Sequence, residues 1–188
     1  MSPTRARSDA QPASTPADGF TVLDECHRTT LAALDRLEEL VALLERGDDD
    51  ATARTIAAGI VSHFSTTVRQ HHQDEERHVF PPLAASPDGD VVQTVLRLQQ
   101  DHNWLEEDWM ELSAPLDAVA CGQSWYDIDV LREGVTIFAA LSRDHIALEE
   151  SILYPQARAR LGAGEQREMG REMAARRRAV RASERGPR

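Results

Sequence analysis

The chain has 188 residues with a net charge of −11, and its 41% apolar and 28% charged residues are ordinary for one soluble globular domain. All 21 basic residues are Arg and ten of them follow residue 156, so the remaining body is acidic, which argues against a nucleic-acid surface there. There are two cysteines, no apolar signal segment and no run long enough to span a membrane, so we expect a cytoplasmic protein with free thiols.

The first part of the chain divides into a leader and one long helix. Residues 1–18 are rich in Ser, Pro, Ala and Thr, a composition that predicts a disordered leader. Residues 21–46 carry apolar side chains at intervals of three and four, the pattern of an amphipathic helix. We expect Gly47 and the Asp run at 48–50 to end this helix and to cap the next one.

Two more helices of the same kind are predicted in the middle of the chain. One spans residues 50–80 and should end at Pro81, because proline disrupts the interior of a helix. The other spans residues 91–113, and Pro115 is expected to kink or break it before a short piece that runs to Ala120.

A fourth helix is predicted over residues 127–154, and an Arg-rich segment follows it. This segment, residues 157–188, should be only marginally helical, with a break at the glycines of residues 162–164. The sequence lacks the alternation of strands, so we expect an all-α protein. Residues 19–156 would form an up-down four-helix bundle and residues 157–188 a basic, partly helical tail.

One eleven-residue stretch occurs twice in the chain, with starting points 74 residues apart. The first copy, from His71, reads HHQDEERHVFP, and the second, from His145, reads HIALEESILYP. Alignment on the final Pro pairs His71 with His145, Glu75 with Glu149, Glu76 with Glu150 and Phe80 with Tyr154. In each copy the His and the Glu four residues later share one helix face, so they can bind one ion.

Each of the four predicted apolar stripes also contains one histidine, namely His27, His71, His102 and His145. Buried imidazoles and carboxylates are costly without partners, so these groups should meet one another. In an up-down bundle they fall within a slab about 10 Å deep, given the rise of an α-helix. We therefore predict that they surround a cation, and imidazole with carboxylate favours Fe, Mn or Zn over Ca or Mg.

The order of these motifs resembles the hemerythrin-like (HHE cation-binding) family. A lone His27 is followed by HHQDEERHVFP, by DHNWLEE from Asp101 and by HIALEESILYP, so the resemblance covers about residues 20–155. It implies that the metal ligands are His27, His71, Glu75, His102, His145 and Glu149. It further implies that the two glutamates bridge a di-iron centre with an oxo or hydroxo bridge.

One position departs from the oxygen-carrying members of that family, which have a second His four residues after the His of the third helix. Here the position is occupied by Glu106, which we count as a seventh candidate metal ligand. An extra carboxylate would stabilise ferric over ferrous iron, so simple reversible O2 transport is not expected.

The expected function is that of a di-iron protein that binds or reacts with O2, peroxide or NO, in oxygen or redox sensing or in stress protection. As an enzyme it would have a weak peroxidase-like, catalase-like or NO-directed activity. Two alternatives remain. One is a metal-dependent regulator whose basic tail acts on a protein partner, and the other is a redox-inert Zn or Mn bundle. We expect neither a membrane nor a nucleic acid as partner.

Some residues near the repeat have competing interpretations. His72 and Glu76 form a rival His-x-x-x-Glu pair, although the alignment on Pro favours His71 and Glu75. Glu75 and His78 give the Glu-x-x-His of ferritin-like bundles, but those bundles need two such motifs. We therefore interpret His72 and His78 as neighbours of the site or packing residues.

Three other side chains are not expected to be metal ligands. Cys26, next to His27, is interpreted as an inert buried thiol rather than a redox switch. His63 is expected to be a partly buried helix residue. Tyr126 could place a phenol near the metal, although nothing in the sequence requires it.

Overall fold

The computed structural model describes residues 18–47 and 51–184, and all the regular structure within these ranges is helical. The predicted all-α class is therefore confirmed. Most of the predicted leader, and the Asp run at 48–50, lie outside the described residues. Asp18 begins the first helix, α1 (Gly19–Glu45), because its carboxylate accepts a hydrogen bond of 3.1 Å from the backbone N–H of Thr21.

The second rod of the fold consists of four successive helical segments. They are α2 (Ala51–Ser62), the π-helix η1 (His63–Val68), α3 (Arg69–His78) and α4 (Phe80–Ala84). The predicted helix end just before Pro81 agrees with the end of α3 at His78, but a further short helix, α4, follows it. Pro81 and Pro82 lie in the first turn of α4, where a missing N–H removes no bond within the helix.

The third and fourth rods are also longer than their proline residues suggest. The helix α5 (Gly89–Ala120) continues through Pro115, so a break there is wrong, and the cost is confined to one backbone hydrogen bond near its end. The fourth rod consists of α6 (Ile128–Leu148), the π-helix η2 (Glu149–Leu153) and α7 (Tyr154–Arg160). Its predicted end at Tyr154 is wrong, because Pro155 lies in the first turn of α7.

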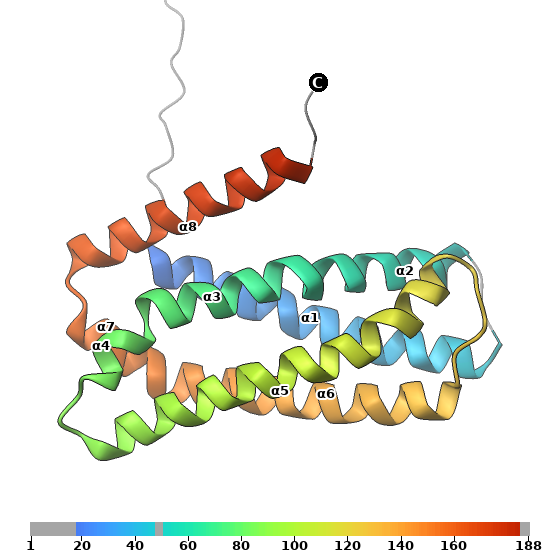
Figure 1. The fold of residues 1–188 in the computed structure, drawn as a ribbon, viewed down its shortest axis with the longest axis horizontal. Coiled ribbons are helices and arrows are strands. Elements are labelled where there is room, and N and C mark those ends of the chain that lie inside the picture. The colour runs from blue at the N-terminus through green and yellow to red at the C-terminus, as the bar shows by residue number, and fades with distance from the viewer. Residues whose placement is uncertain (1–17, 48–50, 185–188) are drawn as a thin grey trace, which may run out of the picture.

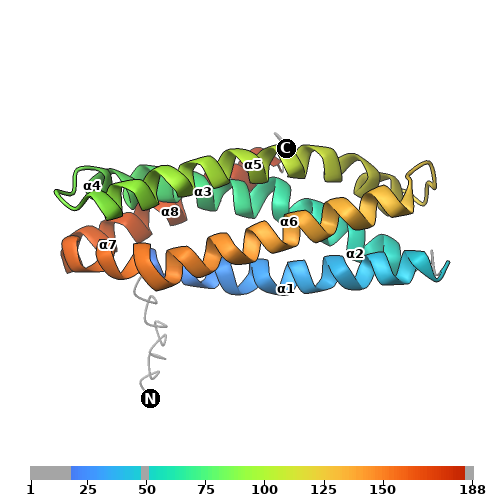
Figure 2. The ribbon, with the colours of Figure 1, turned by 90° about the horizontal axis from the view of Figure 1, so that it is seen from below.

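These four rods lie side by side, and successive rods run in alternating directions (Figures 1 and 2). Their apolar faces form two separate clusters of buried side chains, one around Leu34, Phe64 and Phe138 and one around Phe20 and Leu98. A level of buried polar side chains lies between the two clusters. The rods thus hold polar groups at one depth, with apolar packing on both sides.

The Arg-rich segment forms a helix, α8 (Ala163–Glu184), that packs against α1 and α3 (Figure 1). Met169 and Met173 are buried in the apolar cluster of Phe20, so this segment is part of the folded body rather than a free, marginal tail. Among residues 18–47 and 51–184, no helix combines the length and the apolar character that a membrane crossing requires.

Candidate metal centre

Six of the seven predicted site residues meet at the polar level between the apolar clusters. They come from all four rods: His27 on α1, His71 and Glu75 on α3, His102 on α5, His145 on α6 and Glu149 at the start of η2. All six are buried, with at most 4% of each residue exposed. The helical periodicity thus directs side chains from distant parts of the sequence to one place.

The six residues divide into two groups of four that share both glutamates. Within each group the possible ligand atoms lie within 4.8 Å of one another. The first group is His27, His71, Glu75 and Glu149, and the second is His102, His145, Glu75 and Glu149. Each group therefore offers two imidazoles and two carboxylates, and the sequence repeat relates one group to the other.

The carboxylate of Glu149 extends between the two groups. One of its oxygens lies 3.1 Å from His27 Nε2 and the other lies 3.2 Å from His145 Nε2. Glu75 Oε2 lies 3.4 Å from both His71 Nε2 and His102 Nε2. Glu75 and Glu149, one from each copy of the repeat, therefore each lie close to imidazoles of both groups.

Several of the atoms that face the centre of the cluster have no hydrogen bond in the described part of the chain. They are Glu75 Oε2, His102 Nε2, His145 Nε2 and both carboxylate oxygens of Glu149. Buried polar atoms of this kind are strongly unfavourable when nothing compensates them, and a cation would satisfy them together. The donor set of imidazole and carboxylate fits the binding of a transition-metal cation.

Charge interactions inside the cluster support the same conclusion. Burial disfavours the imidazolium form of His145, but Glu149 and Asp101 outweigh it and raise the pKa of His145 to about 9. Burial opposes ionisation of Glu149, yet the surrounding imidazoles, His145 first, hold its pKa well below the usual range. Burial and the charge of Glu149 raise the pKa of Glu75 to about 7. Protons on the imidazoles thus neutralise Glu149, and a metal cation would replace them.

Two carboxylates outside the cluster orient two of the four imidazoles. Glu150 Oε1 lies 3.0 Å from His27 Nδ1, and Glu76 Oε1 lies 2.9 Å from His102 Nδ1. Asp101 Oδ2 lies 3.7 Å from His145 Nδ1, which is too far for a hydrogen bond. Glu76 and Glu150 are equivalent in the repeat, so each copy supplies one glutamate that both groups share and one that orients an imidazole. Such partners fix the ring orientation and make the imidazole a better ligand. From the sequence alone, Glu76 appears only in the rival pair with His72 and Glu150 has no assigned role, although the repeat aligns the two glutamates.

The aromatic residues that close the two copies cover the lone histidines of α1 and α5. Tyr154 is stacked on His27 with ring centroids 5.2 Å apart, and Phe80 is stacked on His102 at 5.3 Å. The Tyr154 hydroxyl also donates a hydrogen bond of 2.5 Å to Glu75 Oε1. Tyr126, which could have placed a phenol near the metal, packs against the apolar cluster of Leu34, and Tyr154 is the phenol at the site. The alignment of Tyr154 with Phe80 was the available clue.

The structure does not bring Glu106 into the cluster, contrary to the expectation for this position. Its side chain is 53% exposed and its carboxylate lies 3.0 Å from a guanidinium nitrogen of Arg69 across the gap between α3 and α5. The carboxylate thus lies at the surface, and Glu106 belongs to none of the groups of potential ligands.

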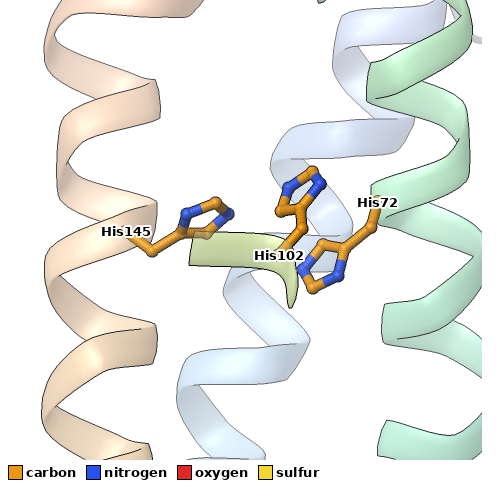
Figure 3. A group of neighbouring side chains, drawn as sticks. All are labelled: His72, His102 and His145. Carbon is orange, nitrogen blue, oxygen red and sulfur yellow. The ribbon is translucent and has the colours of Figure 1, made fainter. Parts of the chain in front are cut away.

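A further imidazole, His72, lies beside the second group. His72 and His145 approach His102 from opposite sides (Figure 3), and ligand atoms of these three residues lie within 4.8 Å of one another. His72 is stacked face to face on His102, with centroids 3.9 Å apart and planes inclined by 13°. Because an imidazole nitrogen binds a metal in the plane of its ring, two parallel rings in this stack cannot direct their lone pairs at one ion. His72 is therefore a neighbour of the site, as the sequence predicts.

A cavity of about 470 Å³ adjoins the cluster between the second rod and α5. Its inner end is formed by the imidazoles of the site and by His72, and its mouth by exposed residues such as Arg69 and Glu106. Solvent and small molecules can therefore approach the centre from one side of the molecule.

Three other residues considered in the sequence, His63, His78 and Cys26, are not among the candidate metal ligands. His63 is partly buried and its Nε2 lies 3.0 Å from Thr30 Oγ1. His78 does not join the cluster and is paired with residues of α8, with its Nε2 at 3.0 Å from a guanidinium nitrogen of Arg176. Cys26 is a buried free thiol, and burial raises its pKa to about 12, which agrees with an inert thiol.

Comparison with known proteins also indicates a cation-binding domain over this part of the chain. The profile of the hemerythrin HHE cation binding domain matches residues 18–157, which include all six residues of the cluster. The chain is also 31% identical over 157 residues to a protein of Haemophilus influenzae (strain ATCC 51907 / DSM 11121 / KW20 / Rd) that is described as uncharacterized. This match covers 83% of the present chain and 88% of the relative. The chain thus belongs to the hemerythrin family of HHE cation-binding domains.

Proposed function

We propose that this protein holds a pair of iron ions in the cluster and uses them to bind or react with O2, peroxide or NO. The main support is that two groups of four ligands share both Glu75 and Glu149. Carboxylates that project inward from facing helices and bridge two ions are typical of di-iron helical bundles. The four rods then correspond to an up-down four-helix bundle of the hemerythrin type.

In this proposal each side chain has a definite task. His27 and His71 would hold one ion, His102 and His145 would hold the other, and both glutamates would be shared by the two ions. The pair would supply electrons by changing between the ferrous and ferric states. The chain offers four ligand atoms at each position, fewer than the six of an octahedral ion, so positions remain for a small molecule.

We assign this chemistry to oxygen or redox sensing, or to protection against peroxide or NO, in the cytoplasm. As an enzyme the protein would be a weak peroxidase, a catalase or an NO-directed catalyst. Reversible O2 transport is not proposed, because the position of the fifth imidazole of the carriers is occupied here by Glu106, which faces solvent.

Metal analysis combined with optical spectroscopy tests the proposal. Protein purified in air after iron-replete growth should contain about two iron ions per chain, and azide or peroxide should shift the optical band of an oxo-bridged ferric pair. Glu149→Ala should abolish the band, whereas Glu107→Ala, at an exposed position of α5, should retain it. A colourless protein that binds Zn or Mn in place of iron would contradict the proposal.

One observation favours a second function, that of a metal-dependent regulator. Arg176 and Arg177 of α8 both pair with Asp74, which directly precedes the bridging residue Glu75. A change in metal occupancy could therefore alter the docking of α8 and its availability to a protein partner. Hydrogen exchange of residues 163–180 in metal-free, ferrous and ferric protein tests this idea, and identical exchange in all three states would contradict it.

A further inference from the structure

The cavity beside the cluster is larger than the small molecules named above require. Its volume of about 470 Å³ lies within the range of sites for organic ligands, roughly 300–1,000 Å³, whereas one water molecule takes about 30 Å³ of liquid volume. A diatomic molecule or hydrogen peroxide would fill only a small part of this space.

The walls of the cavity have two chemically different parts. Next to the imidazoles, an apolar lobe is formed by Phe64, Val68, Leu105, Trp109 and Phe138. Phe64 precedes His71 by seven residues, so the lobe extends about 10 Å along the bundle from the level of the cluster, given the helical rise. A bound molecule would therefore have a polar group at the cluster and an apolar body in the lobe.

Side chains from the second rod and from α5 pair with one another at the mouth of the cavity. Trp109 Nε1 donates a hydrogen bond of 3.2 Å to Ser65 Oγ, and Arg69 pairs with Glu106 at 3.0 Å. The side chains of Arg69 and Glu106 are 64% and 53% exposed, so their ion pair is weak and can open. An organic molecule can thus enter without rearrangement of the helices.

We propose that this cavity binds an organic hydroperoxide, with its apolar group in the lobe and its O–O bond at the cluster, where it is reduced to an alcohol. This inference rests on the proposed di-iron function and adds the class of substrate. The step is balanced: two ferrous ions each give one electron and become ferric, and the O–O bond breaks. Two protons from solvent complete the alcohol and one water molecule.

The first test measures the binding of a ligand to the metal-free protein, so it depends on neither iron nor catalytic activity. The product alcohol 2-phenylpropan-2-ol is added to metal-free protein, and the three tryptophan indole N–H signals are followed by NMR. Only the signal of Trp109 should shift, because Trp109 lines the cavity and the exposed Trp104 and Trp125 do not. No shift at Trp109, or equal shifts at all three, would overturn the proposal.

The second test measures a single turnover of iron-loaded, anaerobically reduced protein. Cumene hydroperoxide should oxidise the ferrous pair about tenfold faster than hydrogen peroxide does, because the lobe adds binding energy for the apolar group. Val68→Phe, which fills the lobe, should lower this ratio of rates by about tenfold. The matched change Val130→Phe, at an exposed position of α6, should leave the ratio unchanged.

If Val68→Phe does not fold, a third variant, Val68→Ala, can be tested in its place. Val68→Ala enlarges the lobe and should raise the rate for a bulkier aryl hydroperoxide relative to hydrogen peroxide. If hydrogen peroxide oxidises the pair but neither Val68 variant changes the ratio, the substrate class is wrong and the di-iron function stands. A protein that shifts Trp109 with the alcohol but takes up no iron would overturn both the reduction step and the proposed function.

Discussion

Glu76 and Glu150 show how much of this site depends on residues that would not touch the metal. Each follows one of the two shared glutamates by one position and pairs with a histidine of another rod, His102 or His27. Their side chains are about half exposed, so they act through orientation rather than through buried charge.

Glu76→Gln should weaken metal binding at the His102 position by roughly 10-fold to 100-fold, because an amide is a poorer acceptor for the imidazole N–H. Competition with a chelator of known affinity measures the change. Glu107→Gln, at an exposed position of α5, is the matched control and should bind metal as the unchanged protein does. Equal affinities in all three proteins would show that Glu76 has no orienting role.

The two cysteines should differ in their reactivity. Burial raises the pKa of Cys26 to about 12, so near neutral pH the residue is an uncharged thiol, whereas Cys121 is exposed. Iodoacetamide should therefore label Cys121 in the native protein, and Cys26 only after unfolding. Mass spectrometry of the labelled peptides distinguishes the two, and rapid native labelling of Cys26 would contradict its burial.

At the scale of the helices, α8 is the element that sequence reasoning described least well. Its composition of Arg and Glu suggests a solvated segment, yet Met169 and Met173 are buried and two arginines converge on Asp74. These contacts join residues about 100 positions apart, so no local pattern could have predicted them.

Asp74→Ala should lower the free energy of unfolding by about 2 kcal/mol, since it leaves two partly buried guanidinium groups without their buried carboxylate. Denaturant titration of the metal-free protein measures this change. Asp117→Ala, at an exposed position of α5, should change stability by less than about 0.5 kcal/mol. A similar stability for both variants would mean that the contact of α8 with Asp74 contributes little.

The prolines and π-helices are a second feature of the helices that could not be predicted correctly from the sequence. Pro81 and Pro155 were expected to end helices, but each lies in the first turn of a new segment that continues the rod. Each rod that carries a copy of the repeat also contains a π-helix, and such insertions often lie at functional sites. An insertion in the backbone has no residue pattern of its own, so it cannot be read from the sequence.

At the scale of the whole molecule, metal binding should depend on pH. The pKa of His145 is raised to about 9, so its contribution to the stability of the metal-free fold is complete below about pH 6.5 and is lost as the pH rises through 9. A metal ion must displace this proton. Metal affinity should therefore increase from pH 6 to pH 9 with release of protons.

Calorimetric titration in buffers of different ionisation enthalpy measures the number of protons released. The proton count should fall as the pH rises through 9, because the imidazole of His145 is then already neutral. A metal affinity that is independent of pH between 6 and 9 would contradict the charged state of the metal-free cluster.

Most of the cluster could be predicted from the sequence because helical periodicity fixes both the face and the depth of a side chain. The six residues that meet all lie within apolar stripes, as His102 does between Leu98 and Leu105. Glu106 could not be placed in the same way, because the position one turn after His102 faces the gap between two rods. That gap depends on how the rods pack, which the stripe of a single helix does not specify.

The pairing of Tyr154 with Phe80 has one more consequence. The Tyr154 hydroxyl, which Phe80 lacks, donates a hydrogen bond to one of the two shared glutamates, Glu75. With iron bound as proposed, this hydrogen bond makes the two ions electronically unequal. A one-electron oxidation should then leave the extra positive charge localised on one ion, and replacement of Tyr154 by Phe should make that charge more evenly shared.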